Sequence, residues 1–290
     1  MSEKIIDINC NPPASIASKI AETIGVKKAN ASVYNLLILG IFAGVYIGFG
    51  AAFATLVSSD LSEFVGIGLT KLASGAVFSV GLMLVVIAGA ELFTGNNLIL
   101  MSALDKKVTF GRVINKWIIV YIANFIGSVL LAYIMFETGL WKEANNLTGI
   151  QALKIANVKV NLSFSAALFR GIGCNWLVCL AVWMAIASRN VIGKIFAIFF
   201  PIMAFVALGF EHCIANMYFI PMGLFLKGTQ AATASGLDLT NLNIYGFLVK
   251  NLIPVTIGNI IGGAFFVAFL YWSVYVRKTK IKNVKKISKL

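Results

Sequence analysis

Residues 89–96, GAELFTGN, and residues 209–216, GFEHCIAN, decide the fold. In both stretches a glycine, a glutamate and an asparagine stand at the same offsets from one another. Each stretch interrupts an apolar block that is too long for one membrane crossing, 64–104 in the first half and 191–225 in the second. Since a helix needs about 20 residues to span a bilayer, each block predicts a helix broken inside the membrane.

Four more apolar segments flank these blocks, at 33–57, 115–136, 162–186 and 247–275, which makes six crossings. The third span of each half also matches, because NFIGSVLLAY from residue 124 resembles NIIGGAFFVAFLY from residue 259. Three crossings are an odd number, so the second half must be inverted and the two breaks meet near the bilayer midplane. We expect an all-α membrane protein with inverted repeats over about 31–140 and 160–276.

The composition supports a membrane protein. Hydrophobic residues make up 59% of the 290 residues and charged residues only 12%, with a mean hydropathy of +0.90. Soluble domains are about one-quarter charged, so the composition excludes a soluble globular protein. Residues 1–30 are expected to be a cytoplasmic segment with an amphipathic helix over 14–25 at the membrane surface. Residues 31–276 form one membrane domain, and residues 277–290 form a basic cytoplasmic tail.

The basic residues predict the orientation. Seventeen of the 24 lysines and arginines would lie on one side, next to spans one, two, four and six. By the positive-inside rule this side is the cytoplasm, so both termini are placed there in a multi-pass cell-membrane protein. Anionic lipids explain the net charge of +13 without nucleic acid. The four cysteines show no CxxC spacing, so neither a metal site nor a cofactor is expected.

Two glutamates lie inside the predicted breaks, at Glu91 and Glu211, with Asn96 and Asn216 at matching positions. Ionisable groups within a membrane are expensive and are functional by default. A carboxylate can instead cap the backbone N–H groups that a broken helix leaves free. Because the four residues match between the halves, we predict this structural role for them.

His212 is the only histidine, and its counterpart in the first half is Leu92. The repeat does not explain it, which favours a function; a neutral histidine hydrogen-bonded in a helix break is the alternative. Thr94 adds a hydroxyl at the first break, and Asn175 could orient the histidine. The ring of Phe93 could constrict a pore by dewetting.

The chain resembles the formate/nitrite transporter family in four stretches: AGVYIGFGA (43–51), AELFTGN (90–96), RGIGCNWLVCLAVW (170–183) and GFEHCIANMYFIPMG (209–223). The resemblance spans nearly the whole chain. It implies an aquaporin-like protomer of six helices, the second and fifth broken. It also implies a homopentamer in which each protomer has its own pore.

The resemblance further implies roles for single residues. His212 would be the central residue that exchanges protons, with Asn175 close to it. The inner, cytoplasmic constriction would consist of Leu92, Phe93, Thr94 and Val178. The outer hydrophobic constriction would consist of Phe78, Leu82 and Phe205. Lys159 would attract anions in the outer vestibule.

The predicted function is passage of a small monovalent anion of a weak acid, most simply formate, with proton exchange at His212. Nitrite, hydrosulfide and lactate stay open as substrates, as does the choice between a channel and a proton-coupled transporter. An enzyme is not expected, since the chain has one histidine and neither HExxH nor GxSxG. An aquaporin-like channel for neutral solutes is the alternative of another class, although paired Asn-Pro-Ala signatures are absent.

Overall fold

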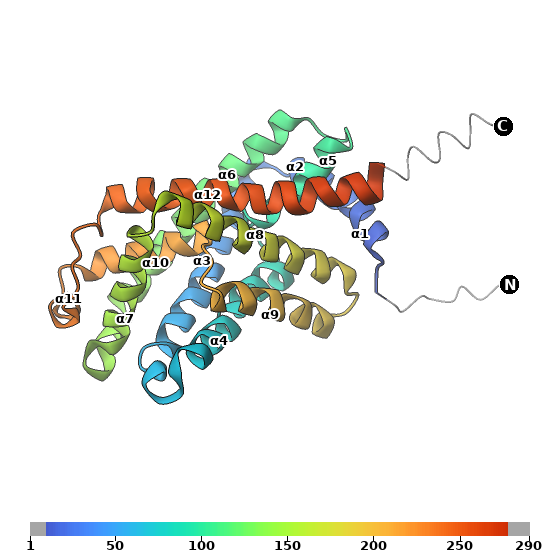
Figure 1. Ribbon diagram of the computed structural model, residues 1–290. Coiled ribbons are helices and arrows are strands. Elements are labelled where there is room, and N and C mark those ends of the chain that lie inside the picture. The colour runs from blue at the N-terminus through green and yellow to red at the C-terminus, as the bar shows by residue number, and fades with distance from the viewer. Residues whose placement is uncertain (1–9, 278–290) are drawn as a thin grey trace, which may run out of the picture.

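The computed structural model describes residues 10–277, and every regular element in that range is a helix (Figure 1). Residues 1–9 and most of the predicted basic tail, 278–290, lie outside the described part. The membrane-spanning elements are α3 (Val33–Val57), α4 (Leu61–Met83), α6 (Phe110–Glu137), α8 (Phe164–Ala187), α9 (Val191–Ala207), α10 (Cys213–Leu226) and a last helix over Gly246–Arg277 that contains α12 (Ile253–Ile260).

Five helices among the described residues are long and apolar enough to cross a membrane: α3, Leu61–Gly89, α6, α8 and Gly246–Arg277. The shorter apolar helices α9 and α10 together supply the remaining crossing. The prediction of six crossings with the second and fifth broken is therefore confirmed. The first span, predicted over 33–57, coincides with α3.

The two breaks have the same construction. The helix that begins as α4 ends at Gly89, and the chain resumes a helical course at η3 (Gly95–Ile99) and α5 (Leu100–Leu104). The helix α9 ends at Ala207, and α10 begins at Cys213. Gly89 has φ +90° and Gly209 has φ +74°. Residues with a Cβ avoid positive φ, which explains a glycine at the start of each break.

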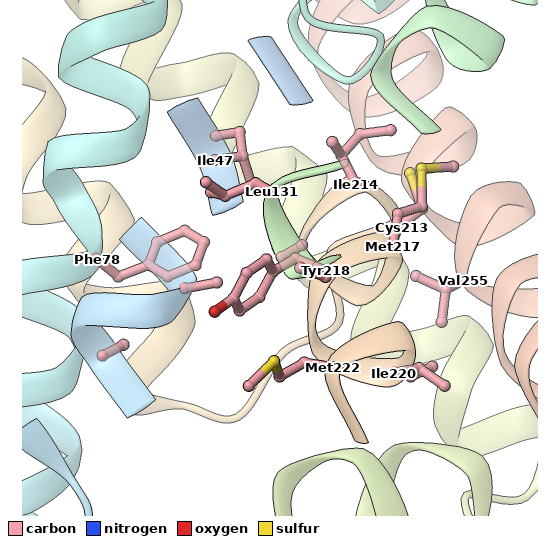
Figure 2. Close-up of a cluster of buried hydrophobic side chains, with 14 of the residues drawn as sticks. Ile47, Phe78, Leu131, Cys213, Ile214, Met217, Tyr218, Ile220, Met222 and Val255 are labelled. Carbon is pink, nitrogen blue, oxygen red and sulfur yellow. The ribbon is translucent and has the colours of Figure 1, made fainter. Parts of the chain in front are cut away.

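Glycines also let neighbouring helices approach closely. A Cβ on Gly44 of α3 would collide with the backbone of Asn124, and one on Gly127 of α6 would collide with the backbone of Ile41. Such small residues are typical of helix contacts in membranes. Figure 2 shows the adjoining core, where side chains from four helices converge: Ile47, Phe78, Leu131 and Tyr218.

The N-terminal segment forms one helical stretch over α1 (Pro13–Lys19), η1 (Ile20–Ile24) and α2 (Gly25–Ala29). The prediction placed an amphipathic helix at the membrane surface. In the structure its apolar residues Ile16 and Ile20 pack on protein, in a buried cluster that includes Trp183 and Val276. The helix therefore covers one end of the bundle. Both ends of the described chain lie at this end (Figure 1).

The opposite end carries two helices that the sequence analysis did not predict, α7 (Glu143–Val160) and α11 (Gln230–Ser235) (Figure 1). The helix α7 packs along α10 and ends just after Lys159. It therefore places this lysine beside the second break.

Candidate functional site

The two breaks meet at a hydrogen bond between side chains. Thr94 Oγ1 lies 2.9 Å from Nε2 of His212, and both side chains are buried. The other ring nitrogen, Nδ1, accepts the backbone N–H of Ala215 at 3.1 Å and so caps the N-terminus of α10. In the neutral ring the proton therefore sits on Nε2, which donates to the threonine hydroxyl.

Two equivalent asparagines cap the backbone that the breaks expose. Asn124 Oδ1 accepts the N–H of Phe93 at 2.9 Å, and its Nδ2 donates to the carbonyls of Gly40 and Glu91. Asn259 repeats the arrangement: its Oδ1 accepts the N–H of Cys213, and its Nδ2 donates to the carbonyls of Gly171 and Glu211. Unpaired backbone groups inside a membrane cost several kcal/mol, on the order of 2–7, so these amides hold both breaks together.

This arrangement corrects the capping role predicted for the glutamates. The Glu91 carboxylate binds side chains instead, Lys28 Nζ at 2.8 Å and Asn96 Nδ2 at 2.8 Å. The Glu211 carboxylate binds Lys159 Nζ at 2.9 Å and Asn216 Nδ2 at 2.7 Å. Each break thus carries a lysine–glutamate–asparagine cluster.

A cavity of about 450 Å³ leads from one end of the molecule to the second break. Its outer lining is exposed, with Ile67 at 70% and Val158 at 60%. Its inner lining is buried and includes Phe78, Phe205 and His212, each at most 3% exposed. This cavity opens at the end away from α1, because its lining includes Ser58, which follows the last residue of α3, and Lys154 and Val158 of α7, the helix at that end (Figure 1). The cavity therefore extends from exposed residues to the histidine ring.

A family model described as "Formate/nitrite transporter" matches residues 14–273 of the chain. A "Probable formate transporter" of Methanothermobacter thermautotrophicus is 42% identical over 281 residues, covering 92% of this chain and 97% of that protein. The chain belongs to the formate/nitrite transporter family. A "Formate channel FocA" of Escherichia coli (strain K12) is 39% identical over 272 residues, covering 92% of this chain and 95% of that protein.

Solved structures of the formate/nitrite transporter family have the same fold. One described as "Pentameric formate channel with formate bound" matches with a TM-score of 0.76 and 38% identity, over 86% of this chain and 99% of that chain. Another, described as "FNT family ion channel", matches with a TM-score of 0.77 and 29% identity, over 89% and 98%. The predicted family and fold class are therefore confirmed.

Two of the three residues predicted for the outer constriction, Phe78 and Phe205, lie together at the inner end of the cavity. The rings of Phe78 and Phe205 meet edge to face with centroids 5.5 Å apart. The Phe205 ring in turn stacks on the His212 ring at 6.0 Å. Leu82, one turn along α4 from Phe78, is also buried.

The residues predicted for the inner constriction are all buried: Leu92, Phe93, Thr94 and Val178. The ring of Phe93 packs edge to face against Tyr121, with centroids 4.9 Å apart, and against Trp117 at 6.3 Å. Both partners belong to α6, so these contacts anchor the first break to a neighbouring helix.

Asn175 and Lys159 make hydrogen bonds that their predicted roles did not include. Asn175 Nδ2 donates to the carbonyls of Thr94 and Asn259 and to Asn97 Oδ1, so it positions the backbone at Thr94 and not the histidine ring itself. Lys159 lines the cavity as expected of a vestibule residue, but the Glu211 carboxylate neutralises its charge.

Sequence reasoning missed the capping role of Asn124 and Asn259. The signal was present, because each asparagine opens the matching stretch of its half's third span. It also missed Lys28, which lies 63 residues from Glu91 in the sequence. Nothing in the local pattern of charges around Lys28 identifies its partner.

Proposed function

We propose that this protein is a membrane channel for small monovalent anions of weak acids, with formate as its main substrate. The observation that carries the proposal is the buried contact of His212 with Thr94 at the inner end of the cavity. It puts a titratable ring where the two broken helices meet. Formate is favoured because two related proteins are described as formate transporters or channels and a related structure has formate bound.

Energetics favours crossing as the neutral acid. Moving a bare unit anion into an apolar environment costs on the order of tens of kcal/mol. Protonating the carboxylate of an acid with a pKa of about 4 at pH 7 costs only about 4 kcal/mol, at about 1.36 kcal/mol per pH unit. Beyond the rings of Phe78 and Phe205 the cheaper species is therefore the neutral acid.

His212 is the proposed site of proton exchange. Both ring nitrogens of a charged imidazole are donors, so Nδ1 must release the N–H of Ala215 when the ring takes up a second proton. Proton uptake is thus coupled to the first turn of α10. The charged ring then gives a proton to the anion and returns to its capping position.

We further propose that five copies assemble, each with its own pore, in the cell membrane with both termini in the cytoplasm. Support comes from the pentameric state named for the related formate channel and from the excess of basic residues on the side of the termini. The many exposed apolar side chains, such as Phe42, Ile118 and Phe196, suit contact with lipid or with neighbouring copies.

Transport into proteoliposomes tests the proposal. Uptake of formate, nitrite and hydrosulfide is measured at two pH values, with water permeability as the neutral-solute arm. We expect saturable formate uptake that rises at acidic pH, and loss of this pH dependence in His212→Asn. Unchanged pH dependence in His212→Asn would refute proton exchange at the ring. Passage of water without any of the anions would favour the neutral-solute channel instead.

A further inference from the structure

Arg170 stands where the two repeats differ. The carbonyl of Leu39 on α3 accepts the N–H of Glu91 at 3.1 Å, and the carbonyl of Arg170 on α8 accepts the N–H of Glu211 at 3.2 Å. The two positions are equivalent, but one holds a leucine and the other an arginine. Since the fold uses only the carbonyl there, the guanidinium needs another explanation. His212, with its counterpart Leu92, departs from the repeat in the same half.

The surroundings of Arg170 connect it to the permeation route. Its side chain is half-buried and lines the cavity whose inner end is formed by Phe205 and His212. Within residues 10–277, neither of the two lysine–glutamate ion pairs involves it. The backbone carbonyl of Arg170 accepts the N–H of Glu211, the residue that precedes His212. This bond holds Arg170 beside the segment that carries the histidine.

The charges that line the cavity single out this residue. In the part of the chain that the structure describes, they comprise four cations and one carboxylate: Lys71, Lys154, Lys159, Arg170 and Glu211. Lys159 and Glu211 pair at 2.9 Å and cancel. Lys71 and Lys154 are exposed ammonium groups, which water solvates strongly. Arg170 remains as a partly desolvated guanidinium, whose parallel N–H groups fit the two oxygens of a carboxylate.

We propose that Arg170 binds the carboxylate of the permeant in the cavity before it reaches His212. The inference rests on the proposed function and adds a residue that selects the substrate. A fork of two donors matches the two oxygens of formate, whereas hydrosulfide has one acceptor atom and gains nothing from the fork. Arg170 thereby favours carboxylates over one-centre anions.

Three variants test this inference in proteoliposomes. Arg170→Leu places the first repeat's residue at this position, Arg170→Lys keeps the charge without the fork, and Lys154→Gln removes an exposed cation of the same cavity. We expect Arg170→Leu to raise the half-saturating formate concentration about three- to tenfold. Arg170→Lys should lower the ratio of formate to hydrosulfide flux, and Lys154→Gln should change both quantities less than about twofold.

Size-exclusion chromatography and thermal unfolding in detergent establish that each variant is folded. A folded Arg170→Leu with the parent's half-saturating concentration and flux ratio overturns the inference. If Arg170→Leu does not fold, Arg170→Lys decides, and an unchanged flux ratio overturns it. Absence of formate flux in the unmodified protein is a different outcome, because it contradicts the proposed function itself.

Discussion

The Thr94 hydroxyl and the His212 ring join the two broken helices directly, at 2.9 Å in a buried site. Thr94→Val keeps the shape of the side chain but leaves Nε2–H without an acceptor, at a cost of about 1–3 kcal/mol. We expect acid-stimulated formate uptake to fall about tenfold in Thr94→Val. Thr94→Ser retains the hydroxyl and should stay close to the parent. A parent-like pH profile in Thr94→Val would show that the hydroxyl does not act on the ring.

The caps at Asn124 and Asn259 predict a matched pair of stability losses. Leucine at either position removes the amide that bonds one backbone N–H and one carbonyl of the break, and one carbonyl of the neighbouring helix α3 or α8. Each variant should lose at least about 1–3 kcal/mol of unfolding free energy, seen as a lower Tm in detergent. Asn35→Leu, at an exposed position on α3, is the control and should change little. A large loss for only one of the two would contradict their equivalence.

At the scale of elements, the sequence predicts the broken helices well, because their causes are local. An apolar block that exceeds the membrane thickness must break, and Gly89 and Gly209 supply the positive φ that the break requires. The helix α7 was not predicted because its segment, Glu143–Val160, is mixed in character and carries positive φ at residues 144–146. Its partner α10 lies far along the chain, so only tertiary packing reveals it.

The same distinction explains the candidate site. His212 was identifiable because it breaks the pattern of the repeat at a matched position. The partners of Glu91 and Glu211 were not identifiable, because Lys28 and Lys159 reach them from other elements of the fold. Arg170 was equally hidden, since its counterpart Leu39 emerges only from the backbone bonds of the two breaks.

The N-terminal helical stretch depends on one of these long-range pairs. Lys28 on α2 bonds to Glu91 at 2.8 Å and to Asn96 at 3.0 Å, so it fastens Pro13–Ala29 to the first break. Lys28→Met should weaken this attachment by about 1 kcal/mol, with about fivefold faster amide exchange over residues 13–29. Lys27→Met, at the exposed neighbour, is the matched control. Equal exchange in the two variants would mean that apolar burial of Ile16 and Ile20 suffices.

For the whole molecule, an even number of crossings and the uneven charge distribution make one prediction about orientation. Of the four cysteines only Cys10 is exposed, and as the first described residue it lies at the end of the bundle where the described part of the chain begins and ends. The helix α7 lies at the opposite end (Figure 1), and its Lys154 is an exposed residue of the cavity lining. A membrane-impermeant maleimide should therefore label Cys10 only from the cytoplasmic face. With Cys10→Ser as background, Lys154→Cys should be labelled only from the other face.

Cys174, Cys179 and Cys213 are buried and should not react in intact membranes, so Cys10→Ser alone gives the blank. Labelling of both positions from one face would rule out an arrangement that spans the membrane between them. Labelling from opposite faces but with Cys10 outside would keep the crossings and reverse the orientation that the basic residues predict.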